Sequence, residues 1–280
     1  MKTIPLSLIT SEVKRLCIEA NYDIREEVRE KFSEALEKEE SPRGKDILQM
    51  MLENAEYAAE ERIPYCQDTG VVVVFVELGE EVCFDAPGFM DAINDGVRQG
   101  YTGGLLRKSM VKDPLNRENT GDNTPAVVHV EIVRGDGLKL KVAAKGSGSE
   151  NMSRVKMLTP AEDIGGVKNF VVETVSRAGP NACPPGVVGV GIGGDLEKCA
   201  ILAKKALYRG VGTKNSDPFY SSLEEELLDE INGLGIGPQS IGGTVTVLEV
   251  HIEVCPCHIG SLPVAVNLDC HAHRYKEALL

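Results

Sequence analysis

The spacing of apolar residues predicts helices over the first 62 residues of the chain. The first helix should present Val13, Leu16, Cys17 and Ala20 on one face, because these residues recur with the helical period. We expect Ser11 to cap that helix, and residues 26–39 to form a second, highly charged helix. A third should begin after Ser41, since Pro42 suits a first helical turn. Its apolar stripe consists of Ile47, Leu48, Met51, Leu52, Ala55 and Ala58.

The remainder of the chain alternates between strand and helix patterns. The apolar run 71–78, which only Glu77 interrupts, is typical of a central strand that is buried on both faces. The segments 127–133 and 138–144 flank an Arg-Gly-Asp-Gly turn and predict a β-hairpin. Other strands are expected at 186–194, 244–254 and 262–266, and other helices at 87–97, 161–177, 196–206 and 223–231. We expect Asp195 to cap the helix 196–206.

This order of elements predicts an α+β (mixed α/β) fold. We expect a single large domain over residues 1–280, in which a mainly helical N-terminal region, 1–62, packs on a mixed β-sheet core at 63–280. The polar, glycine-rich stretch 101–125 should form a long ordered loop. Such loops inside compact domains are usually functional.

The composition is ordinary for a globular protein and argues against several functional classes. Hydrophobic residues make up 42% and charged residues 26% of the 280 residues, which is enough for a sizeable core. The formal net charge of -13 argues against nucleic-acid binding, since phosphate contacts need clustered Lys and Arg. No apolar stretch reaches the roughly 20 residues of a membrane span. The N-terminal apolar patch is too short for a signal peptide, so we expect a cytoplasmic protein.

Eight cysteines are more than packing requires in a cytosolic chain of this size. Cys17 and Cys199 lie on apolar helical stripes, where we expect them to be core residues. Cys66, Cys183 and Cys270 instead lie at strand edges or in Pro/Gly-rich loops. Iron–sulfur cubanes take thiolate ligands. Three thiolates leave one iron with an exchangeable position, which can act as a Lewis acid on a hydroxyl or carboxylate.

Four strings of residues together resemble a known family. They are Cys-Gln-Asp-Thr-Gly from Cys66, Lys-Gly-Ser-Gly-Ser-Glu-Asn from Lys145, Asn-Ala-Cys-Pro-Pro-Gly from Asn181, and Leu-Pro-Val-Ala-Val-Asn-Leu-Asp-Cys-His-Ala-His-Arg from Leu262. In this order they are similar to the iron–sulfur-dependent (class I) fumarases and the L-tartrate dehydratases. The resemblance runs from Pro64 to the C-terminus. It implies the α subunit of the two-subunit form, equivalent to the N-terminal catalytic domain of the single-chain form.

The resemblance implies a cofactor and the residues around it. A 4Fe–4S cluster with one open iron would be held by Cys66, Cys183 and Cys270. Gln67 and Asp68 would face the substrate beside that iron.

The resemblance also implies residues that bind the substrate and move protons. Arg107 would bind a substrate carboxylate, and the backbone at Gly146 and Gly148 would lie close to the bound acid. His258 would pair with Asp68, and together they would handle the proton of the departing hydroxyl. His271 and His273 are expected in the loop around Cys270 rather than in the chemistry.

The implied reaction is the reversible hydration of fumarate to L-malate, with L(+)-tartrate dehydration as the alternative. Eliminating water requires a better leaving group, removal of a weakly acidic carbon-bound proton and stabilisation of the resulting charge. The resemblance further implies a β subunit, equivalent to a C-terminal swivelling domain, that completes the active site in a hetero-oligomer. Since the net charge is -13, cations for a dicarboxylate must be concentrated locally or come from that partner.

A dinucleotide-binding interpretation competes for part of the sequence. Gly189-x-Gly191-x-x-Gly194 matches the dinucleotide-binding fingerprint. However, these glycines lie within a predicted strand instead of the turn that follows it. We expect them to allow close backbone packing near the cluster.

A zinc interpretation competes as well. Cys255-x-Cys257-His258 together with Cys270-x-x-His273 could ligate a tetrahedral ion. The chain would then be a zinc-stabilised regulatory or scaffold subunit with no enzymatic activity.

Overall fold

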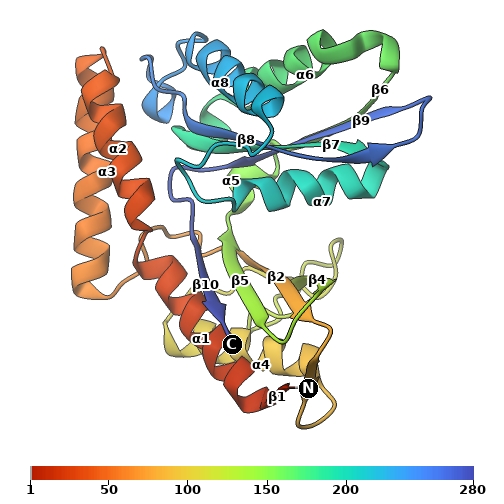
Figure 1. Cartoon of the computed structure of the whole chain (residues 1–280). Helices are drawn as coiled ribbons and strands as arrows, with labels where there is room; N and C mark the ends of the chain where they lie inside the picture. Colours follow the sequence, from red (N-terminus) through yellow and green to blue (C-terminus); the bar gives the residue numbers. More distant parts are fainter. Residues whose placement is uncertain (1) are drawn as a thin grey trace. The chain divides into compact units, whose positions relative to one another are not determined.

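The computed structural model describes residues 2–280, which form two compact units (Figure 1). Unit 1 consists of the chain up to Arg25, Asn54–Ser147 and Arg274–Leu280, and unit 2 of Glu26–Glu53 and Gly148–His273. The predicted α+β (mixed α/β) class is confirmed, because helices pack on a mixed sheet in each unit. The assignment of residues 1–280 to a single domain stays a prediction.

Unit 1 is built on a four-stranded sheet with the order β10-β5-β2-β4. The strands are β2 (Val71–Gly79), β4 (Val127–Val133), β5 (Leu138–Lys145) and β10 (Tyr275–Leu279). The β2–β4 pair is parallel and the other pairs are antiparallel. The helices that pack on each other and cover this sheet are α1 (Leu6–Tyr22) and α4 (Phe89–Gly103). A separate parallel pair is formed by β1 (Lys2–Ile4) and β3 (Val82–Phe84).

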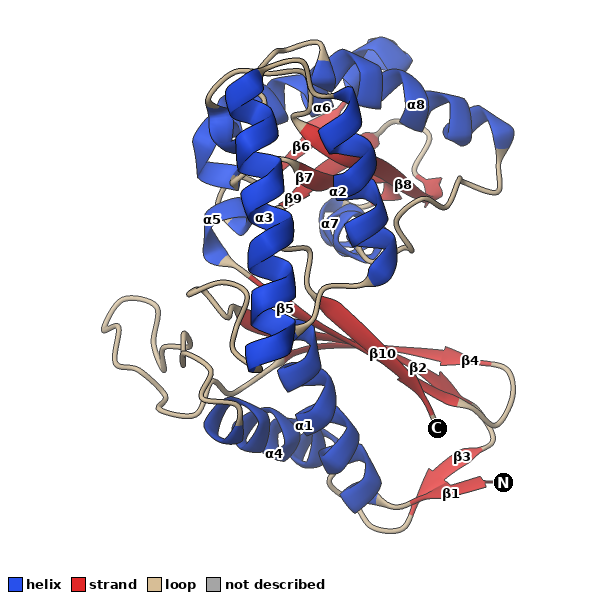
Figure 2. Cartoon of the chain, turned by 90° about the vertical axis from the view of Figure 1, so that its left-hand side faces the viewer, coloured by secondary structure: helices blue, strands red, loops and turns tan. Residues whose placement is uncertain are grey.

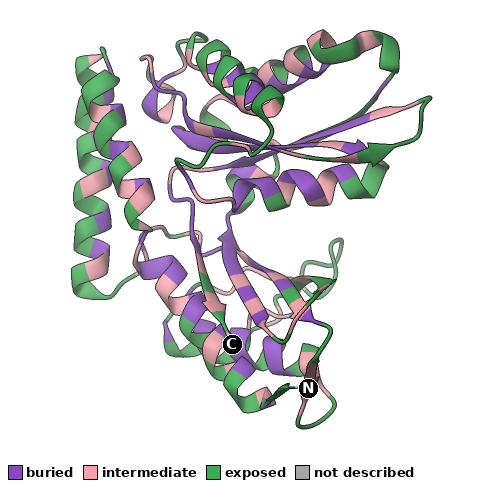
Figure 3. Ribbon diagram, in the orientation of Figure 1, coloured by how far each residue is buried: buried purple, intermediate pink, exposed green. Residues whose placement is uncertain are grey.

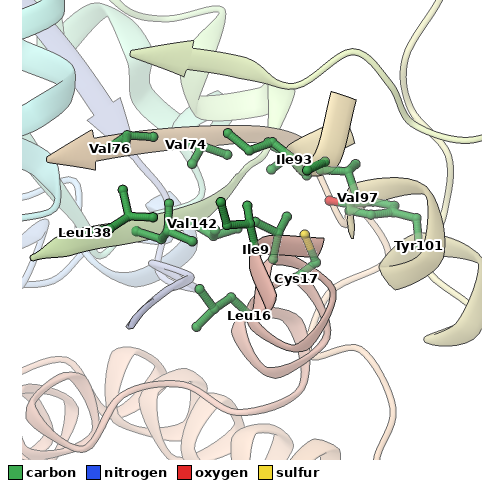
Figure 4. Close-up of a cluster of buried hydrophobic side chains, with 14 of the residues drawn as sticks. Ile9, Leu16, Cys17, Val74, Val76, Ile93, Val97, Tyr101, Leu138 and Val142 are labelled. Carbon is green, nitrogen blue, oxygen red and sulfur yellow. The ribbon is translucent and has the colours of Figure 1, made fainter. Parts of the chain in front are cut away.

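The core of unit 1 lies between α1, α4 and the sheet (Figure 4). Each of the following side chains is at most 1% exposed: Ile9, Leu16, Cys17, Val74, Val76, Ile93, Val97, Leu138 and Val142. Burial of one such large aliphatic side chain contributes about 1.5–3 kcal/mol. The helical stripe predicted for the N-terminal region, including Cys17 as a core residue, is therefore confirmed. Figure 3 shows the same alternation of buried and exposed faces along α1.

The hairpin predicted from residues 127–133 and 138–144 is wrong. Strand β2 lies between β4 and β5, with Val73 paired to Val127 on one side and to Ala143 on the other. The reason is that β2 buries Val72, Val73 and Val74 in succession and so takes a central position. The short connection after β4 crosses the end of β2, where the N–H of Gly79 donates to the carbonyl of Gly137.

Unit 2 is built on a second four-stranded sheet with the order β6-β9-β7-β8. The strands are β6 (Arg154–Leu158), β7 (Gly186–Gly194), β8 (Val247–Cys257) and β9 (Leu262–Asp269). The β7–β8 pair is parallel, and β9 runs antiparallel to β7 and β6. Helix α7 (Leu196–Leu207) covers one face, and α6 (Asp163–Ala178) and α8 (Pro218–Asn232) cover the other (Figures 1 and 2). Helix α2 (Glu26–Lys38) contacts β8, and α3 (Pro42–Glu61) begins in this unit.

Several predicted element ends were wrong or incomplete. Helix α1 begins at Leu6, so Ser11 lies inside it and its hydroxyl donates to the carbonyl of Leu8 instead of capping the helix. Helix α4 continues to Gly103, because Tyr101 is buried and its hydroxyl donates to the Thr69 carbonyl. The cap at Asp195 is confirmed, since its carboxylate accepts from Lys198 N–H at 2.8 Å. The described residues contain no helix long and apolar enough to cross a membrane.

The glycines of β7 allow α7 to lie against the strand at backbone distance. A Cβ on Gly189 would be 2.1 Å from the carbonyl oxygen of Ala203, and one on Gly191 would be 2.0 Å from that of Cys199. Close backbone packing is thus confirmed, but its partner is a helix and not a cofactor. Cys199 is fully buried in this contact, as predicted.

Replacing Gly191 by Ala should therefore push α7 away from β7. We expect Gly191→Ala to destabilise the protein by about 1–3 kcal/mol through overpacking, measured by urea unfolding. Gly103→Ala is the matched control, because a Cβ at Gly103 would meet only the flexible end of Lys14 at 3.9 Å. Equal unfolding midpoints for the two variants would contradict this account of the β7–α7 contact.

The buried carboxylate of Glu39 lies between α2 and α3 and binds backbone N–H groups there. The side chain of Glu39 is 1% exposed and accepts from the backbone N–H groups of Ser41, Thr244 and Val245 at 2.8–3.0 Å. Burial opposes ionisation, but these N–H donors outweigh it, so the pKa of Glu39 is lowered. The charged form therefore stabilises the loop 242–245 against the helical corner.

This lowered pKa gives the stability of the apoprotein a defined pH dependence. We expect Glu39→Gln to destabilise it by about 1.5–3 kcal/mol near pH 7, because charge-assisted hydrogen bonds are lost. The stabilisation is fully present above the unfolded pKa of Glu, about 4.3, and is lost as pH falls through the lower folded pKa. Urea unfolding of parent and variant across this range measures the difference. Glu37→Gln, on the exposed face of α2, is the control and should match the parent throughout.

Candidate functional site

The Cys66-Gln67-Asp68 segment is held in unit 1 by its neighbour Tyr65. The Tyr65 N–H donates to the carbonyl of Asn21 at 2.8 Å, and the Tyr65 carbonyl accepts from the Asn54 amide at 2.9 Å. Cys66 and Asp68 are partly exposed, and Gln67 is exposed. The segment thus has a fixed backbone and presents its three polar side chains, as a binding site requires.

The carboxylate of Asp68 has defined partners in unit 1. Its Oδ2 accepts from the backbone N–H of Ser147 at 2.9 Å, and its Oδ1 accepts from the N–H of Gly70 at 3.1 Å. A Cβ on Gly146 would lie 3.3 Å from Asp68 Oδ2 and 3.5 Å from Arg274 Nη2. Because Gly146 has no side chain, the carboxylate of Asp68 and the guanidinium of Arg274 can both approach its backbone. Ser147, which donates to Asp68, is the next residue in the chain.

Three cationic residues of unit 1 lie on segments whose backbone contacts the Asp68 segment or Gly146. Arg274 is 2% exposed and donates from Nη1 to Oδ1 of Asn21 at 3.0 Å, and Lys145 is 3% exposed. The side chain of Arg107 is exposed, but its carbonyl accepts from the Thr69 hydroxyl at 2.8 Å, which ties its loop to the Asp68 segment. Arg274 was not among the site residues predicted from the sequence, although it ends the motif that contains Cys270.

In unit 2, strand pairing brings Cys183 and Cys270 to one edge of the sheet. Val187 of β7 pairs with Asp269 of β9, so the chain enters β7 and leaves β9 at the same place. The backbone N–H of His271 donates to the carbonyl of Cys183 at 3.2 Å. Two of the three predicted ligands therefore lie on loops that are hydrogen-bonded to each other.

Two further predicted residues belong to this edge. A Cβ on Gly148 would be 3.0 Å from the carbonyl oxygen of Asn181, so the Gly148 segment lies against the loop that carries Cys183. His273 is fully buried, with Nδ1 2.9 Å from Oδ2 of Asp269, and it closes the turn after Cys270. Both contacts support a structural role for the residues that surround the two cysteines.

His258 lies at the opposite end of the same sheet from these two cysteines, and its pairing with Asp68 stays a prediction. Cys257 of β8 pairs with Gly194 at the far end of β7, and His258 follows in the exposed turn before β9. The nine residues of β7 separate this turn from the Cys183 edge by about 26 Å, at about 3.3 Å per residue. Within one chain, His258 cannot reach a group bound by Cys183 and Cys270.

The same separation contradicts the zinc interpretation. Cys257 and His258 lie at one end of the sheet, whereas Cys270 and His273 lie at the other. Among residues 2–280, no group of three or more His, Cys, Asp and Glu side chains is arranged to hold a metal ion. A four-ligand zinc site from these residues is therefore wrong for this fold.

The chemistry of the thiols fits the predicted ligand set. Burial raises the pKa of Cys17 to about 12 and also raises that of Cys199, which disfavours the thiolate that ligation requires. Cys66, Cys183 and Cys270 are partly exposed. This donor set is of the kind that binds an iron–sulfur cluster.

Comparison with known proteins identifies the family. A family model described as fumarate hydratase (Fumerase) matches residues 10–279. The chain is 41% identical over 273 residues to the "Putative L(+)-tartrate dehydratase subunit alpha" of Methanocaldococcus jannaschii, and the match covers 95% of each chain. It is 36% identical over 253 residues to the L(+)-tartrate dehydratase subunit alpha of Escherichia coli K12, covering 89% of this chain and 83% of the relative. The chain therefore belongs to the fumarate hydratase (Fumerase) family, the iron–sulfur hydro-lyase family of fumarases and L-tartrate dehydratases that its motifs resemble.

Proposed function

We propose that this chain is the catalytic α subunit of a hydro-lyase that acts on a four-carbon dicarboxylate. The observation that carries the proposal is the hydrogen-bonded pairing of the Cys183 and Cys270 loops at one sheet edge. Fumarate, converted reversibly to L-malate, is the substrate that the motifs favour. L(+)-tartrate is the second candidate, because the similar proteins carry that name.

We propose that Cys66, Cys183 and Cys270 hold a 4Fe–4S cluster. When bound, the cluster would supply a Lewis acid for the substrate hydroxyl. The partial exposure of these three thiols and the burial of Cys17 and Cys199 support this choice of ligands.

The chain's own polar residues would bind the acid and hold a proton. The N–H groups of Ser147 and Gly70 orient Asp68. Its carboxylate is thereby held in one position, from which it would handle the proton of the leaving hydroxyl. Gln67 and Arg107 would bind the substrate, with a carboxylate on the guanidinium fork. The backbone at Gly146 and Gly148 would allow the acid to approach closely.

We further propose that a β subunit completes the site in a hetero-oligomer. The names of the similar proteins as α subunits support such a partner. The base for the carbon-bound proton would come from that subunit, and any role of His258 would require a second copy of this chain. We expect the complex in the cytoplasm, where thiols stay reduced.

The first test is activity of the α subunit combined anaerobically with its β subunit and reconstituted with iron and sulfide. We expect hydration of fumarate or dehydration of L(+)-tartrate, and both should be assayed together with the opposite tartrate enantiomer. Cys183→Ser should lower activity at least about hundredfold, since one thiolate is lost. Cys83→Ser, another partly exposed thiol, should leave it unchanged. Full activity of the Cys183 variant would refute the proposed ligand set.

The second test separates binding from chemistry at Arg107. We expect Arg107→Gln to raise KM for the dicarboxylate by about 10–100-fold, with a smaller effect on kcat, because a charge-assisted contact is lost. Arg117→Gln provides the control, since Arg117 is an exposed arginine of the same loop. Steady-state kinetics on both variants decide the matter: an unchanged KM in Arg107→Gln would remove Arg107 from the proposed site.

A further inference from the structure

Gln239 directs both of its nitrogen donors at the carbonyl that follows Cys183. Its backbone N–H donates to the oxygen of Pro184 at 2.9 Å, and its side-chain Nε2 donates to the same oxygen at 3.0 Å. Gln239 lies in a short 3-10 turn, η3 (Pro238–Ser240), 55 residues from Pro184. The loop that carries Gln239, distant in sequence, is thus hydrogen-bonded to the backbone next to the proposed ligand Cys183.

His271 makes the corresponding contact on the preceding carbonyl. Its backbone N–H donates to the oxygen of Cys183 at 3.2 Å, and its Nδ1 lies 3.1 Å from the same oxygen. A carbonyl oxygen only accepts, so Nδ1 donates to it in the tautomer that carries a proton on Nδ1. Nδ1 also lies 3.4 Å from Nε2 of Gln239. In that tautomer, two successive carbonyls of the Cys183 loop receive two donors each, from Gln239 and from His271.

The backbone at this place is strained, which makes the contacts informative. Cys183 has a φ of 51°, Gln239 a φ of 48° and Ser240 a φ of 59°, all in the left-handed region that disfavours residues other than glycine. Such conformations are unfavourable and persist only where surrounding contacts impose them. The four hydrogen bonds supply that constraint.

The loop that carries Gln239 is itself anchored in unit 2. The N–H of Gly237 donates to the hydroxyl of Thr246 at 3.2 Å, and Glu39 binds the N–H groups of Thr244 and Val245. Gln239 is therefore presented by a loop that is fixed at both ends. A residue on such a loop can hold another segment in place rather than move with it.

We propose that Gln239 and His271 are positioning residues that hold the Cys183 loop against the Cys270 turn in the conformation that binds the cluster. This inference rests on the proposed function, and it adds two residues that do not ligate iron themselves. The consequence is preorganisation: Cys183 is already in place before the cluster binds, so less ordering is needed on binding and the bound cluster is retained longer.

The test measures how fast the reconstituted protein loses its cluster. Parent, Gln239→Leu, His271→Ala and His271→Asn are loaded anaerobically and challenged with an iron chelator, and the decay of visible absorbance is recorded. We expect Gln239→Leu and His271→Ala to lose the cluster on the order of tenfold faster. His271→Asn should stay close to the parent, because an Asn side-chain N–H can replace the Nδ1 donor. Gln49→Leu, which loses only an exposed contact to Glu53, is the control.

Two outcomes would overturn the proposal. One is parent-like cluster loss in both Gln239→Leu and His271→Ala. The other is a melting temperature of the apoprotein so reduced in these variants that general unfolding accounts for the loss.

A second measurement separates this inference from the proposed function. If the parent takes up no iron, the cluster assignment fails, and the positioning role is then judged on the apoprotein. Mass spectrometry of alkylated thiols should show faster modification of Cys183 in Gln239→Leu than in the parent, with the rate at Cys66 unchanged. An unchanged Cys183 rate would refute the positioning role.

Discussion

The antiparallel pairing of β7 with β9 is the constraint on which the candidate site of unit 2 depends. Because Val187 pairs with Asp269, the loop that enters β7 and the turn that leaves β9 meet at one edge. The proximity of the Cys183 loop and the Cys270 turn follows from that register, and a shift of the strands would separate them. Helix α7 packs on β7 at Gly189 and Gly191, at a distance that a larger residue could not accommodate. This packing helps to keep β7 in its register.

The charge of the whole chain differs from the charge of the proposed binding region. A net charge of -13 suggests poor affinity for an acid. Unit 1 nevertheless buries Arg274 and Lys145 and ties the loop of Arg107 to Thr69. Burying a guanidinium is costly unless it is hydrogen-bonded, and Asn21 supplies such a bond. These local cations support the proposed binding of an acid despite the negative total charge.

The failure of the predicted hairpin and the position of His258 both follow from the arrangement of the strands. The predicted hairpin assumed that strands joined by a short turn pair with each other, but β2 takes the place between them. His258 lies close to Cys270 in sequence, but β9 carries the chain across the sheet between them. The first arrangement is decided by a strand from elsewhere in the chain, and the second by the length of the strand that joins the two residues.

The sequence by itself determined the helical stripes, the central strand 71–78, the cap at Asp195, the buried state of Cys17 and Cys199, and the family. These depend on the chemistry of residues a few positions apart, or on motifs that can be compared directly. Only the tertiary structure decided the order of the strands, the approach of Arg274 to Gly146, and the hydrogen bonds of Gln239 and His271 to the Cys183 loop. The reason is that these contacts join segments tens of residues apart, and no local pattern records which distant donor meets which carbonyl.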